Sequence, residues 1–376
     1  MLVRLLIFLA IVLLLFVPLN WLVYRQLVRI HPKRRRWIRG VLIVCNLLWP
    51  FLFFLRTFNP AMRVIRALLG PPWFAWLSFL LLYAAFLFLV LLAWIPFRRR
   101  RAFPEFARWP SRVFLSLLLA GWIVGIYHAL VPLRVERVPV TIDALPPSLE
   151  GTRLVLMGDL HVGLFTRPSR LRKIFATANA LQPRAVLLAG DMIDDDPFFV
   201  PKLLDGTRSL DASIPILAVL GNHEMYGDPR AVTERMRGSR IRLLVNEGHA
   251  LGDLWIAGIS DFAASEVPGA VTPDLAKALA AKPPASLALA LAHQPKVIDA
   301  AKSRAVPLAV CAHTHGGQCG FRPLRWSLAG VFLTYHMGLY RVGPTQLYVN
   351  TGTGYWLVPF RLGMTPEITL IELRGR

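Results

Sequence analysis

The N-terminal third of this 376-residue chain almost lacks acidic residues. Residues 1–132 contain 17 Lys and Arg but a single acid, Glu105, whereas residues 133–376 contain 26 Lys and Arg and 21 Asp and Glu. The chain also lacks a glycine period, internal repeats and low-complexity tracts, and its 55% hydrophobic content excludes intrinsic disorder. An apolar, basic first part and a nearly charge-balanced second part predict a membrane region followed by a globular domain.

Cysteine is equally scarce, with three residues in the whole chain. Cys45 lies in an apolar run, where it is expected as a small packing residue. Cys311 and Cys319 lie in the globular part, and we expect both to be unpaired, because eight residues of separation do not by themselves supply disulfide geometry.

Four apolar runs are long enough to cross a bilayer, which takes roughly 20 helical residues. They extend over about Leu5 to Tyr24, Ile38 to Leu55, Trp73 to Ile95 and Val113 to Leu133. Pro50 interrupts the second run, so a kinked span or a re-entrant segment is an alternative there. Basic clusters lie between the runs, which is typical of loops at anionic lipid headgroups and not of a nucleic-acid surface.

The distribution of basic residues among the loops predicts the topology. Seven basic residues follow the first run and six follow the third, against three after the second and one, Arg4, before the first. By the positive-inside rule, the first and third loops are cytoplasmic, and both termini and the globular part lie outside. The alternative is a cleaved signal peptide over about residues 1–20, but no small-residue cleavage site follows that run.

The globular part is predicted to be an α/β domain over residues 151–376, after a transmembrane region over 1–133 and a linker strand and turn over 134–150. Val138, Val140 and Ile142 alternate in the linker strand. Helices are expected between Pro168 and Pro183 and from Thr272-Pro273 onward. Eight short apolar runs are typical of buried strands: 154–157, 185–189, 216–220, 254–257, 287–292, 308–312, 347–350 and 368–373.

Five of these strands end in Asp, Asn or His, and strand ends at one edge of a sheet are where α/β folds build sites. The residues are Asp159, His161, Asp191, Asp194, Asn222, His223, Glu224, His293, His313 and His315, with His336 a weaker candidate. Singly, each has a structural alternative, such as a helix cap, a turn or a hydrogen-bonded core histidine, and residues 194–196 read as a solvated loop. Together, carboxylate, amide and imidazole groups without thiolate indicate manganese, iron or zinc, and a bridging carboxylate can hold two such ions about 3.5 to 4 Å apart.

In this order, the motifs Asp159-X-His161, Gly190-Asp191-X-X-Asp194, Gly221-Asn222-His223-Glu224, His293 and His313-X-His315 resemble the calcineurin-like metallophosphoesterase superfamily. Segments 347–352, 361–363 and 366–369 are similar to its membrane-associated bacterial phosphodiesterase branch. The resemblance covers about residues 150–373. It implies a β-sandwich flanked by helices, here behind a bundle of about four transmembrane helices in a bacterial cell membrane. Ala312 stands where the family usually has Gly.

The resemblance also implies two divalent metal ions as cofactors. One would be held by Asp159, His161, Asp191 and His315, and the other by Asp191, Asn222, His293 and His313, with Asp191 as the bridge. His223 would hydrogen-bond the phosphate and protonate the leaving oxygen, while Glu224 and Asp194 orient loops. The implied reaction is in-line attack of a metal-bound hydroxide on a phosphodiester or phosphomonoester.

The membrane anchor favours a lipid or cell-envelope substrate, with membrane lipids and no nucleic acid as partners. Phe321 to Leu333 mixes Arg322 and Arg325 with apolar residues and is expected to contact the bilayer or an acyl chain; a core-packing insertion is the alternative. Two other functions compete: hydrolysis of a nucleotide-linked lipid precursor such as UDP-diacylglucosamine at the cytoplasmic face, and an inactive membrane scaffold. Retention of His223 and all seven predicted ligands favours an enzyme.

Overall fold

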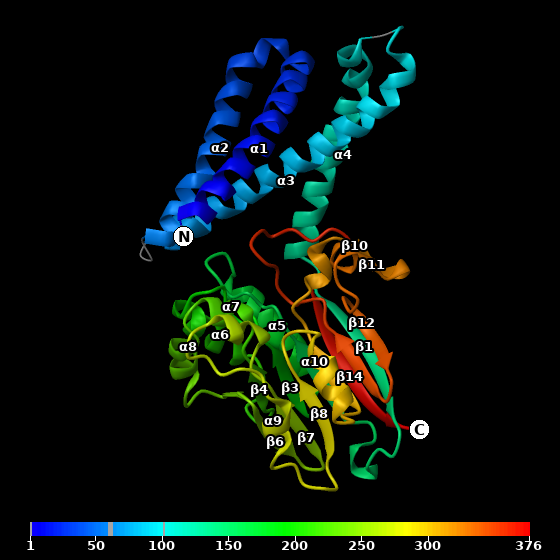
Figure 1. Cartoon of the computed structure of the whole chain (residues 1–376). Helices are drawn as coiled ribbons and strands as arrows, with labels where there is room; N and C mark the ends of the chain where they lie inside the picture. Colours follow the sequence, from blue (N-terminus) through cyan, green and yellow to red (C-terminus); the bar gives the residue numbers. More distant parts are fainter. Residues whose placement is uncertain (1, 59–62, 101) are drawn as a thin grey trace. The chain divides into compact units, whose positions relative to one another are not determined.

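The structure is a computed structural model that describes residues 2–58, 63–100 and 102–376 (Figure 1). Its side chains are described at 16–47, at 65, at 68–100 and at 102–376. The chain divides into two compact units, Met1–Ile123 and Val124–Arg376.

Four long helices make up the N-terminal region: α1 (Leu2–Ile30), α2 (Arg35–Phe58), α3 (Arg63–Trp94) and α4 (Phe103–Leu130). Short 3₁₀ turns, η1 (Pro32–Arg34) and η3 (Ile95–Phe97), follow α1 and α3. Val23 of α1 is buried together with Leu80, Tyr83 and Leu87 of α3, so an apolar contact joins these two helices. Residues 124–130 of α4 belong to the second unit.

Two helical stretches of the described chain, Leu68–Phe97 and Phe103–Leu130, are long and apolar enough to cross a membrane. They coincide with the third and fourth predicted spans. The first two predicted spans coincide with α1 and α2, and α2 is one helix through position 50. The side chains of residues 1–15 and 48–64 lie outside the described part, as do Arg66 and Arg101, so the spans and loop charges predicted there stay predictions.

Two six-stranded sheets form the second unit. The first has the order β1 (Arg134–Ile142), β14 (Glu367–Gly375), β2 (Arg153–Met157), β3 (Ala185–Ala189), β4 (Ile216–Val219) and β5 (Ile241–Leu243). The second has the order β12 (Gly338–Val342), β13 (Thr345–Val349), β9 (Leu308–Cys311), β8 (Leu287–Leu291), β7 (Leu254–Gly258) and β6 (Glu247–Leu251). All eight predicted strands are present. The strand predicted as a linker is β1, which pairs with β14 over nine residues and is therefore part of the sheet.

Parallel pairing joins β2, β3, β4 and the edge strand β5 in the first sheet, and β7, β8, β9 and β13 in the second. Alternate residues of each sheet point to the opposite sheet, and Leu156, Leu187, Leu289 and Val310 meet in the core between them. Because helices cover the outer faces, both faces of these strands are buried, which accounts for their continuous apolar runs.

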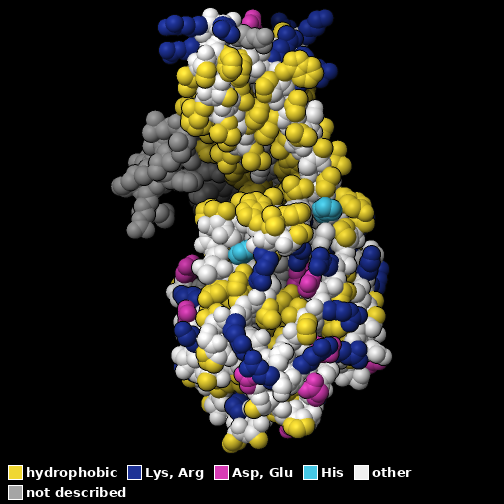
Figure 2. All heavy atoms as spheres, turned by 90° about the vertical axis from the view of Figure 1, so that its right-hand side faces the viewer, with side chains coloured by type: hydrophobic (Ala, Val, Ile, Leu, Met, Phe, Trp, Pro, Cys, Tyr) yellow, Lys and Arg dark blue, Asp and Glu magenta, His cyan; other side chains and the backbone are white. Residues whose placement is uncertain are grey.

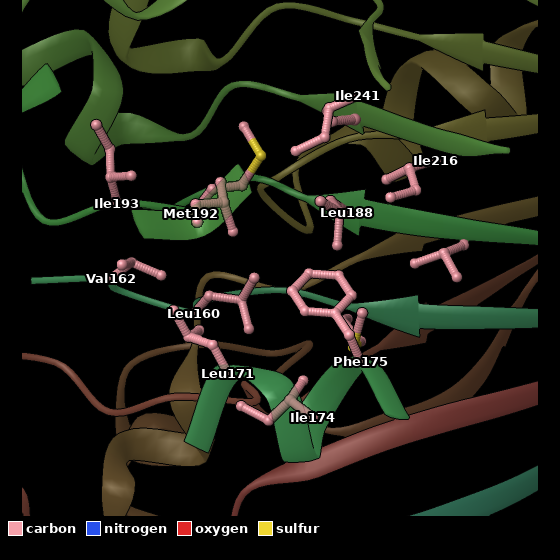
Figure 3. Close-up of a cluster of buried hydrophobic side chains, with 14 of the residues drawn as sticks. Leu160, Val162, Leu171, Ile174, Phe175, Leu188, Met192, Ile193, Ile216 and Ile241 are labelled. Carbon is pink, nitrogen blue, oxygen red and sulfur yellow. The ribbon is translucent and has the colours of Figure 1, made fainter. Parts of the chain in front are cut away.

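Helices α5 (Pro168–Ala180), α6 (Val200–Thr207) and α8 (Pro229–Met236) cover the first sheet. Figure 3 shows Phe175 of α5 next to Leu188 of β3 and Leu171 next to Leu160, in the cluster that also contains Ile174. Helices α9 (Leu275–Leu279) and α10 (Val297–Ser303) cover the second sheet. The predicted α/β fold is confirmed, as a sandwich of two sheets flanked by helices.

The start of α9 corrects one prediction. The helix begins at Leu275 and not at Thr272-Pro273, because the side chain of Asp274 accepts a hydrogen bond from Lys277 N (3.0 Å) and caps the helix. The main chain at Thr272 lies before the helix, where its carbonyl accepts from Asn246 Nδ2 (2.7 Å).

Shorter elements complete the unit: α7 (Asn222–Tyr226), β10 (Gly320–Phe321), β11 (Trp326–Ser327), and the 3₁₀ turns η4 (Pro147–Leu149), η5 (Pro197–Phe199), η6 (Phe262–Glu266), η7 (His315–Gln318), η8 (Arg322–Leu324) and η9 (Leu328–Val331). The three cysteines are unpaired, as predicted, and Cys311 is buried in β9.

Candidate metal centre

The predicted ligands lie directly after the carboxyl ends of parallel strands from both sheets. Asp159, Asp191 and Asn222 follow β2, β3 and β4 of the first sheet. His293 follows β8, and His313 and His315 follow β9 of the second. Because the two sheets pack face to face, the two rows of strand ends meet at one edge of the sandwich.

A first cluster contains Asp159, His161, Asp191 and His315, whose candidate ligand atoms all lie within 4.8 Å of one another. Nε2 of His161 lies 3.1 Å from Nε2 of His315 and 3.7 Å from Oδ2 of Asp191. Nε2 of His315 lies 3.8 Å from Oδ2 of Asp159. All four residues are buried.

A second cluster shares Asp191 with the first. It contains Asp191, His293 and His313, and Asn222 Oδ1 lies 3.0 Å from Nε2 of His293. That same nitrogen is 3.2 Å from Oδ2 of Asp191 and 3.1 Å from Nδ1 of His313. Oδ2 of Asp191 therefore faces both clusters, and the structure brings together all seven residues that the sequence predicted as ligands.

The backbone at these positions is unusual. Asp159, His161, Asp191, His313 and His315 have φ angles of 52°, 42°, 47°, 72° and 51°. Left-handed backbone is rare for residues other than glycine, although Asp and His tolerate it better than most, and such residues gather at functional sites. Here it occurs at five of the seven predicted ligands, in the loops that follow β2, β3 and β9.

The loops pack closely because Gly158 and Gly190 have no Cβ atom. A Cβ on Gly190, whose φ is +77°, would lie 2.7 Å from Nδ1 of His293. A Cβ on Gly158 would collide with the Cβ of Ala312. The Ala that departs from the usual family residue is thus accommodated by the glycine opposite it.

Glu224 holds the main chain of the two loops that follow β3 and β4 in the first sheet. Its buried carboxylate accepts hydrogen bonds from the main-chain nitrogens of Asp191 (3.0 Å), Ile193 (3.0 Å) and Gly221 (2.7 Å). A carboxylate that accepts three main-chain donors fixes their geometry, so Glu224 orients the Asp191 loop without facing either cluster itself.

His223 lies beside the first cluster. Its Nδ1 is 2.6 Å from Oδ1 of Asp195, its main-chain nitrogen donates to Oδ1 of Asp191 (2.9 Å), and its ring centre is 4.6 Å from that of His161. Asp195 was predicted to lie in a solvated loop; its side chain is 56% exposed, yet it also orients His223. Nothing in the local sequence indicates this pairing, because 28 residues separate the two.

At three of the predicted ligands, Asp191, His313 and His315, the electrostatics favour the protonation state that a cation requires. Burial raises the pKa of Asp191, but His293 and His161 outweigh it and hold that pKa well below the ordinary value. Burial and the neighbouring His293 lower the pKa of His313 to about 3. Burial, His161 and Arg361 likewise lower the pKa of His315. Asp191 is therefore ionised, and His313 and His315 are neutral, at physiological pH.

Two further contacts in the clusters, at His293 and at Asp159, also suit the binding of a cation. Nδ1 of His293 donates to the carbonyl of Ala189 (2.7 Å), which directs Nε2 toward Asp191 and Asn222. Oδ2 of Asp159 is buried and has no hydrogen-bond donor in the described structure. An unpartnered buried carboxylate oxygen is costly unless a cation compensates it, so the residues fit divalent metal ions.

Arg361 is a site residue whose functional role was not predicted from the sequence. It is fully buried, and its Nη2 lies 3.2 Å from Nδ1 of His315. The guanidinium also donates to the carbonyls of Gly354 (2.7 Å) and Thr351 (2.8 Å). A fully buried arginine is exceptional on composition alone, but nothing in the local sequence shows that it would be buried.

Two other candidates, His336 and Asp194, are not members of these two clusters. Nδ1 of His336 is 2.9 Å from the hydroxyl of Ser327, so it belongs to the segment after β9 and not to either group of ligand atoms. Oδ1 of Asp194 lies 3.4 Å from Nδ1 of His161, on the side of that ring away from His315. Asp194, His161 and His223 form a third group of candidate ligand atoms, all within 4.8 Å of one another.

Known proteins resemble this chain in the same region. The family model described as "Calcineurin-like phosphoesterase" matches residues 152–317. An uncharacterized metallophosphoesterase of Helicobacter pylori is 31% identical over 277 residues, covering 73% of this chain and 72% of that protein. A Danio rerio protein named "Transmembrane protein with metallophosphoesterase domain" is 32% identical over 333 residues, covering 81% of this chain and 74% of that protein.

Proposed function

The chain belongs to the calcineurin-like phosphoesterase family, and from this premise we propose that it is a membrane-anchored phosphoesterase with two divalent metal ions, acting on a lipid or cell-envelope phosphoester. One observation carries the proposal: Oδ2 of Asp191 lies 3.7 Å from Nε2 of His161 and 3.2 Å from Nε2 of His293. A single carboxylate oxygen between two ligand clusters is what a bridged pair of cations requires.

Asp159, His161, Asp191 and His315 would hold one ion, and Asp191, Asn222, His293 and His313 the other. When bound, divalent cations supply positive charge that polarises a phosphoryl group and makes water more acidic. Carboxylate, amide and imidazole ligands match manganese, iron or zinc. The burial of these side chains excludes bulk water and strengthens their electrostatic interactions with a bound phosphate.

His223 is the residue that would handle the leaving group. Its Nδ1 faces Asp195 and its side chain is 12% exposed, so Nε2 is the nitrogen left to reach a phosphoester. Asp195 keeps the proton on Nδ1 and stabilises the imidazolium, so His223 can donate the Nε2 proton to the departing oxygen. No nucleophilic side chain needs to form a covalent intermediate.

We also propose that the protein crosses a bacterial cell membrane several times, with about four spans and its second unit outside the cytoplasm. Supporting this are the two candidate spans, the basic loops of the sequence and the transmembrane relative in Danio rerio. A site tethered to a bilayer meets lipid phosphates at high effective concentration, which favours a lipid or envelope substrate.

Hydrolysis by the purified full-length chain tests the enzymatic part. We would measure manganese-dependent release from phospholipids, lipid pyrophosphates, UDP-diacylglucosamine and model mono- and diesters. Asp191→Ala should abolish turnover and lower the bound metal measured by mass spectrometry. The matched control is Asp205→Ala, which removes a half-exposed carboxylate of α6 away from the clusters. Full metal content and turnover in Asp191→Ala would refute the assignment.

Cysteine labelling in intact cells tests the orientation. In a background with the native cysteines replaced, Asp253→Cys and Arg99→Cys would place single exposed thiols in the second unit and in a basic loop, respectively. A membrane-impermeant maleimide should label only Asp253→Cys before cell lysis. Labelling of Arg99→Cys alone would place the second unit in the cytoplasm and favour the nucleotide-linked precursor.

A further inference from the structure

The segment between the His313-X-His315 motif and β12 exposes an unusual amount of apolar surface. We call residues 321–333 the apolar hairpin. Six of its side chains expose between 48% and 82% of their surface: Phe321, Leu324, Trp326, Leu328, Val331 and Phe332. Single exposed apolar residues are common on soluble proteins, but a contiguous group marks an interaction site.

Hydrogen bonds fix the conformation of the hairpin in which these side chains are exposed. Phe321 pairs with Trp326 across the antiparallel β10–β11 ladder, and the hydroxyl of Ser327 accepts from Gly330 N (3.3 Å). Arg325 donates to the carbonyls of Met337 (3.2 Å) and Leu339 (3.1 Å). The hairpin therefore does not bury its apolar side chains in the core, and the core-packing alternative for this segment does not hold.

A short series of main-chain contacts joins the hairpin to the end of α4. Arg361 N donates to the carbonyl of Gly125 (2.9 Å), and Gly363 N lies 3.5 Å from Nδ1 of His128. The same segment, residues 361–363, also bonds to the residues just before the hairpin. Leu362 N donates to Gln318 O (2.8 Å), and Gly320 N donates to Leu362 O (2.9 Å). One extended segment thus separates the last turns of α4 from the start of the hairpin.

The sequence of α4 fixes where the bilayer surface meets this unit. The 21 residues from 113 to 133 contain no Lys, Arg, Asp or Glu. The helical part of this stretch, residues 113–130 of α4, is about 27 Å long at 1.5 Å per residue, close to the thickness of the hydrocarbon core. A membrane-spanning α4 would place residues near Leu130 at the membrane interface, and Tyr127, Leu130 and Val131 are 43–56% exposed.

Arginines line a pocket beside the hairpin. A pocket of about 370 Å³ is lined by Arg134, Arg137, Arg322 and Arg325, with Glu136 as its single acid. Arg134 is the first charged residue after α4, so the pocket lies where headgroups would be. Arg322 is paired with Glu367 (2.8 Å) and Arg134 with Glu136 (2.6 Å), whereas Arg137 is an exposed residue of β1. In Figure 2, hydrophobic side chains gather at this end of the second unit with Lys and Arg beside them.

We propose that the apolar hairpin and the arginine pocket form a surface that docks on an anionic lipid bilayer. The hairpin enters the interfacial zone, and Arg137 faces headgroup phosphates. The inference rests on the part of the proposed function in which α4 spans that bilayer. Because the hairpin begins six residues after His315, docking would hold the metal centre beside phosphoesters in the plane of the membrane.

Charge favours a bilayer over a second copy of the chain as the occupant. The hairpin contains no Asp or Glu, and the pocket beside it has four arginines against one acid. A symmetric contact between two copies would bring like charges together, which is costly, whereas an anionic membrane complements them.

A fluorescent probe on the full-length protein tests the docking directly. In a background with Cys45, Cys311 and Cys319 replaced by Ala, Phe332→Cys would carry an environment-sensitive dye. The matched control is Val271→Cys, which labels an exposed apolar residue between η6 and α9. In vesicles of phosphatidylcholine and phosphatidylglycerol, lipid-attached nitroxide should quench the dye at 332, and aqueous iodide the dye at 271. Quenching at 332 by iodide and not by nitroxide would overturn the proposal, as would energy transfer between copies labelled there.

Activity provides a second arm that separates this inference from the proposed function. Phe332→Asp should lower turnover of a vesicle-embedded phosphodiester by about tenfold, the effect of losing one buried aromatic contact with lipid. Hydrolysis of water-soluble bis(p-nitrophenyl) phosphate should be unchanged. Equal loss on both substrates would contradict docking, whereas a wild-type protein that is quenched by lipid but hydrolyses neither substrate would contradict only the proposed function.

A separate pair of variants tests the arginine pocket. Arg137→Gln should remove the increase in vesicle-substrate turnover that phosphatidylglycerol produces over phosphatidylcholine alone. The control is Arg208→Gln, which removes an arginine that is 82% exposed beside α6. An unchanged response in Arg137→Gln would show that the pocket does not face lipid.

Discussion

Oδ1 of Asp195 lies 2.6 Å from Nδ1 of His223, and this contact joins the loop after β3 to the first turn of α7. A histidine held through one ring nitrogen presents the other in a fixed direction, which is the requirement for proton transfer to a leaving oxygen. The contact therefore gives His223, the proposed acid, a role different from that of the predicted ligands, although it directly follows Asn222 in the chain.

Asp195→Asn should lower kcat by about tenfold without lowering metal content, because the amide no longer stabilises the His223 imidazolium. The loss should be large for an alkyl phosphodiester and small for a p-nitrophenyl ester, whose leaving group needs no proton. Steady-state kinetics with both substrates gives the comparison. Equal losses on the two esters would mean that Asp195 supports the fold and not proton transfer.

Gly221→Ala should reduce metal binding by roughly tenfold to a hundredfold, the usual effect of disturbing a group that positions a ligand. A Cβ at this position would collide with Oδ1 of Asp191 and lie 2.5 Å from its main-chain nitrogen. Bound metal is measured after equilibrium dialysis against manganese. Gly40→Ala is the control, because no atom lies within 4 Å of its added methyl, and unaltered metal content in Gly221→Ala would contradict the close approach.

Glu367→Gln should destabilise the protein by about 3 kcal/mol at neutral pH, because Arg322 loses its buried partner. Burial alone raises the pKa of Glu367, but Arg322 and hydrogen bonds from Thr369, Thr351 and Tyr348 bring it below the ordinary 4.5. A lowered pKa in the folded state contributes stability above the unfolded value and loses it as the pH falls through the folded value.

The stability difference between wild type and Glu367→Gln should therefore be constant above pH 5 and shrink toward pH 3. Thermal unfolding of the full chain in detergent, followed by circular dichroism across this range, gives the difference. Glu372→Gln, which removes a partly exposed partner of Arg374, should show little change at any pH. A difference that grew on acidification would have the wrong sign for a carboxylate of lowered pKa.

Arg361→Lys should destabilise the second unit by about 2 kcal/mol, because an ammonium cannot reach all the carbonyls that the guanidinium satisfies. Arg361 donates to Gly354 O, Thr351 O and Met364 O as well as contacting His315. Metal content should also fall, since these contacts hold the loop that carries His315. Thermal unfolding and metal analysis on one preparation check both effects, and a stable variant with normal metal content would exclude Arg361 from the site.

The ligand positions could be predicted because they depend on a local rule. Each of Asp159, Asp191, Asn222, His293 and His313 comes directly after a short apolar run, and parallel strands place their carboxyl ends at one edge. The helix start at Leu275 was misplaced by two residues, because Thr272 and Asp274 can both cap a helix and only the surrounding contacts select between them.

Long-range partners could not be predicted in the same way. Asp195 and His223 are 28 residues apart, and Arg361 and His315 are 46 apart. Nothing in the local sequence of an arginine or an aspartate distinguishes a buried partner from a solvated charge. The same holds for Arg322, which the sequence grouped with a lipid-contacting segment and which the structure pairs with Glu367.

The sequence by itself determined the division into an apolar basic region and an α/β domain, the order of the strands along the chain, and the residue types after each strand, because these follow from composition and short-range periodicity. Only the tertiary structure decided that Asp191 faces both ligand clusters, that Asp195 holds His223, and that residues 321–333 stay exposed next to the end of α4. The physical reason is that these relationships join segments through the packing of two sheets, and the cost and gain of each contact depend on which distant atoms the fold brings within reach.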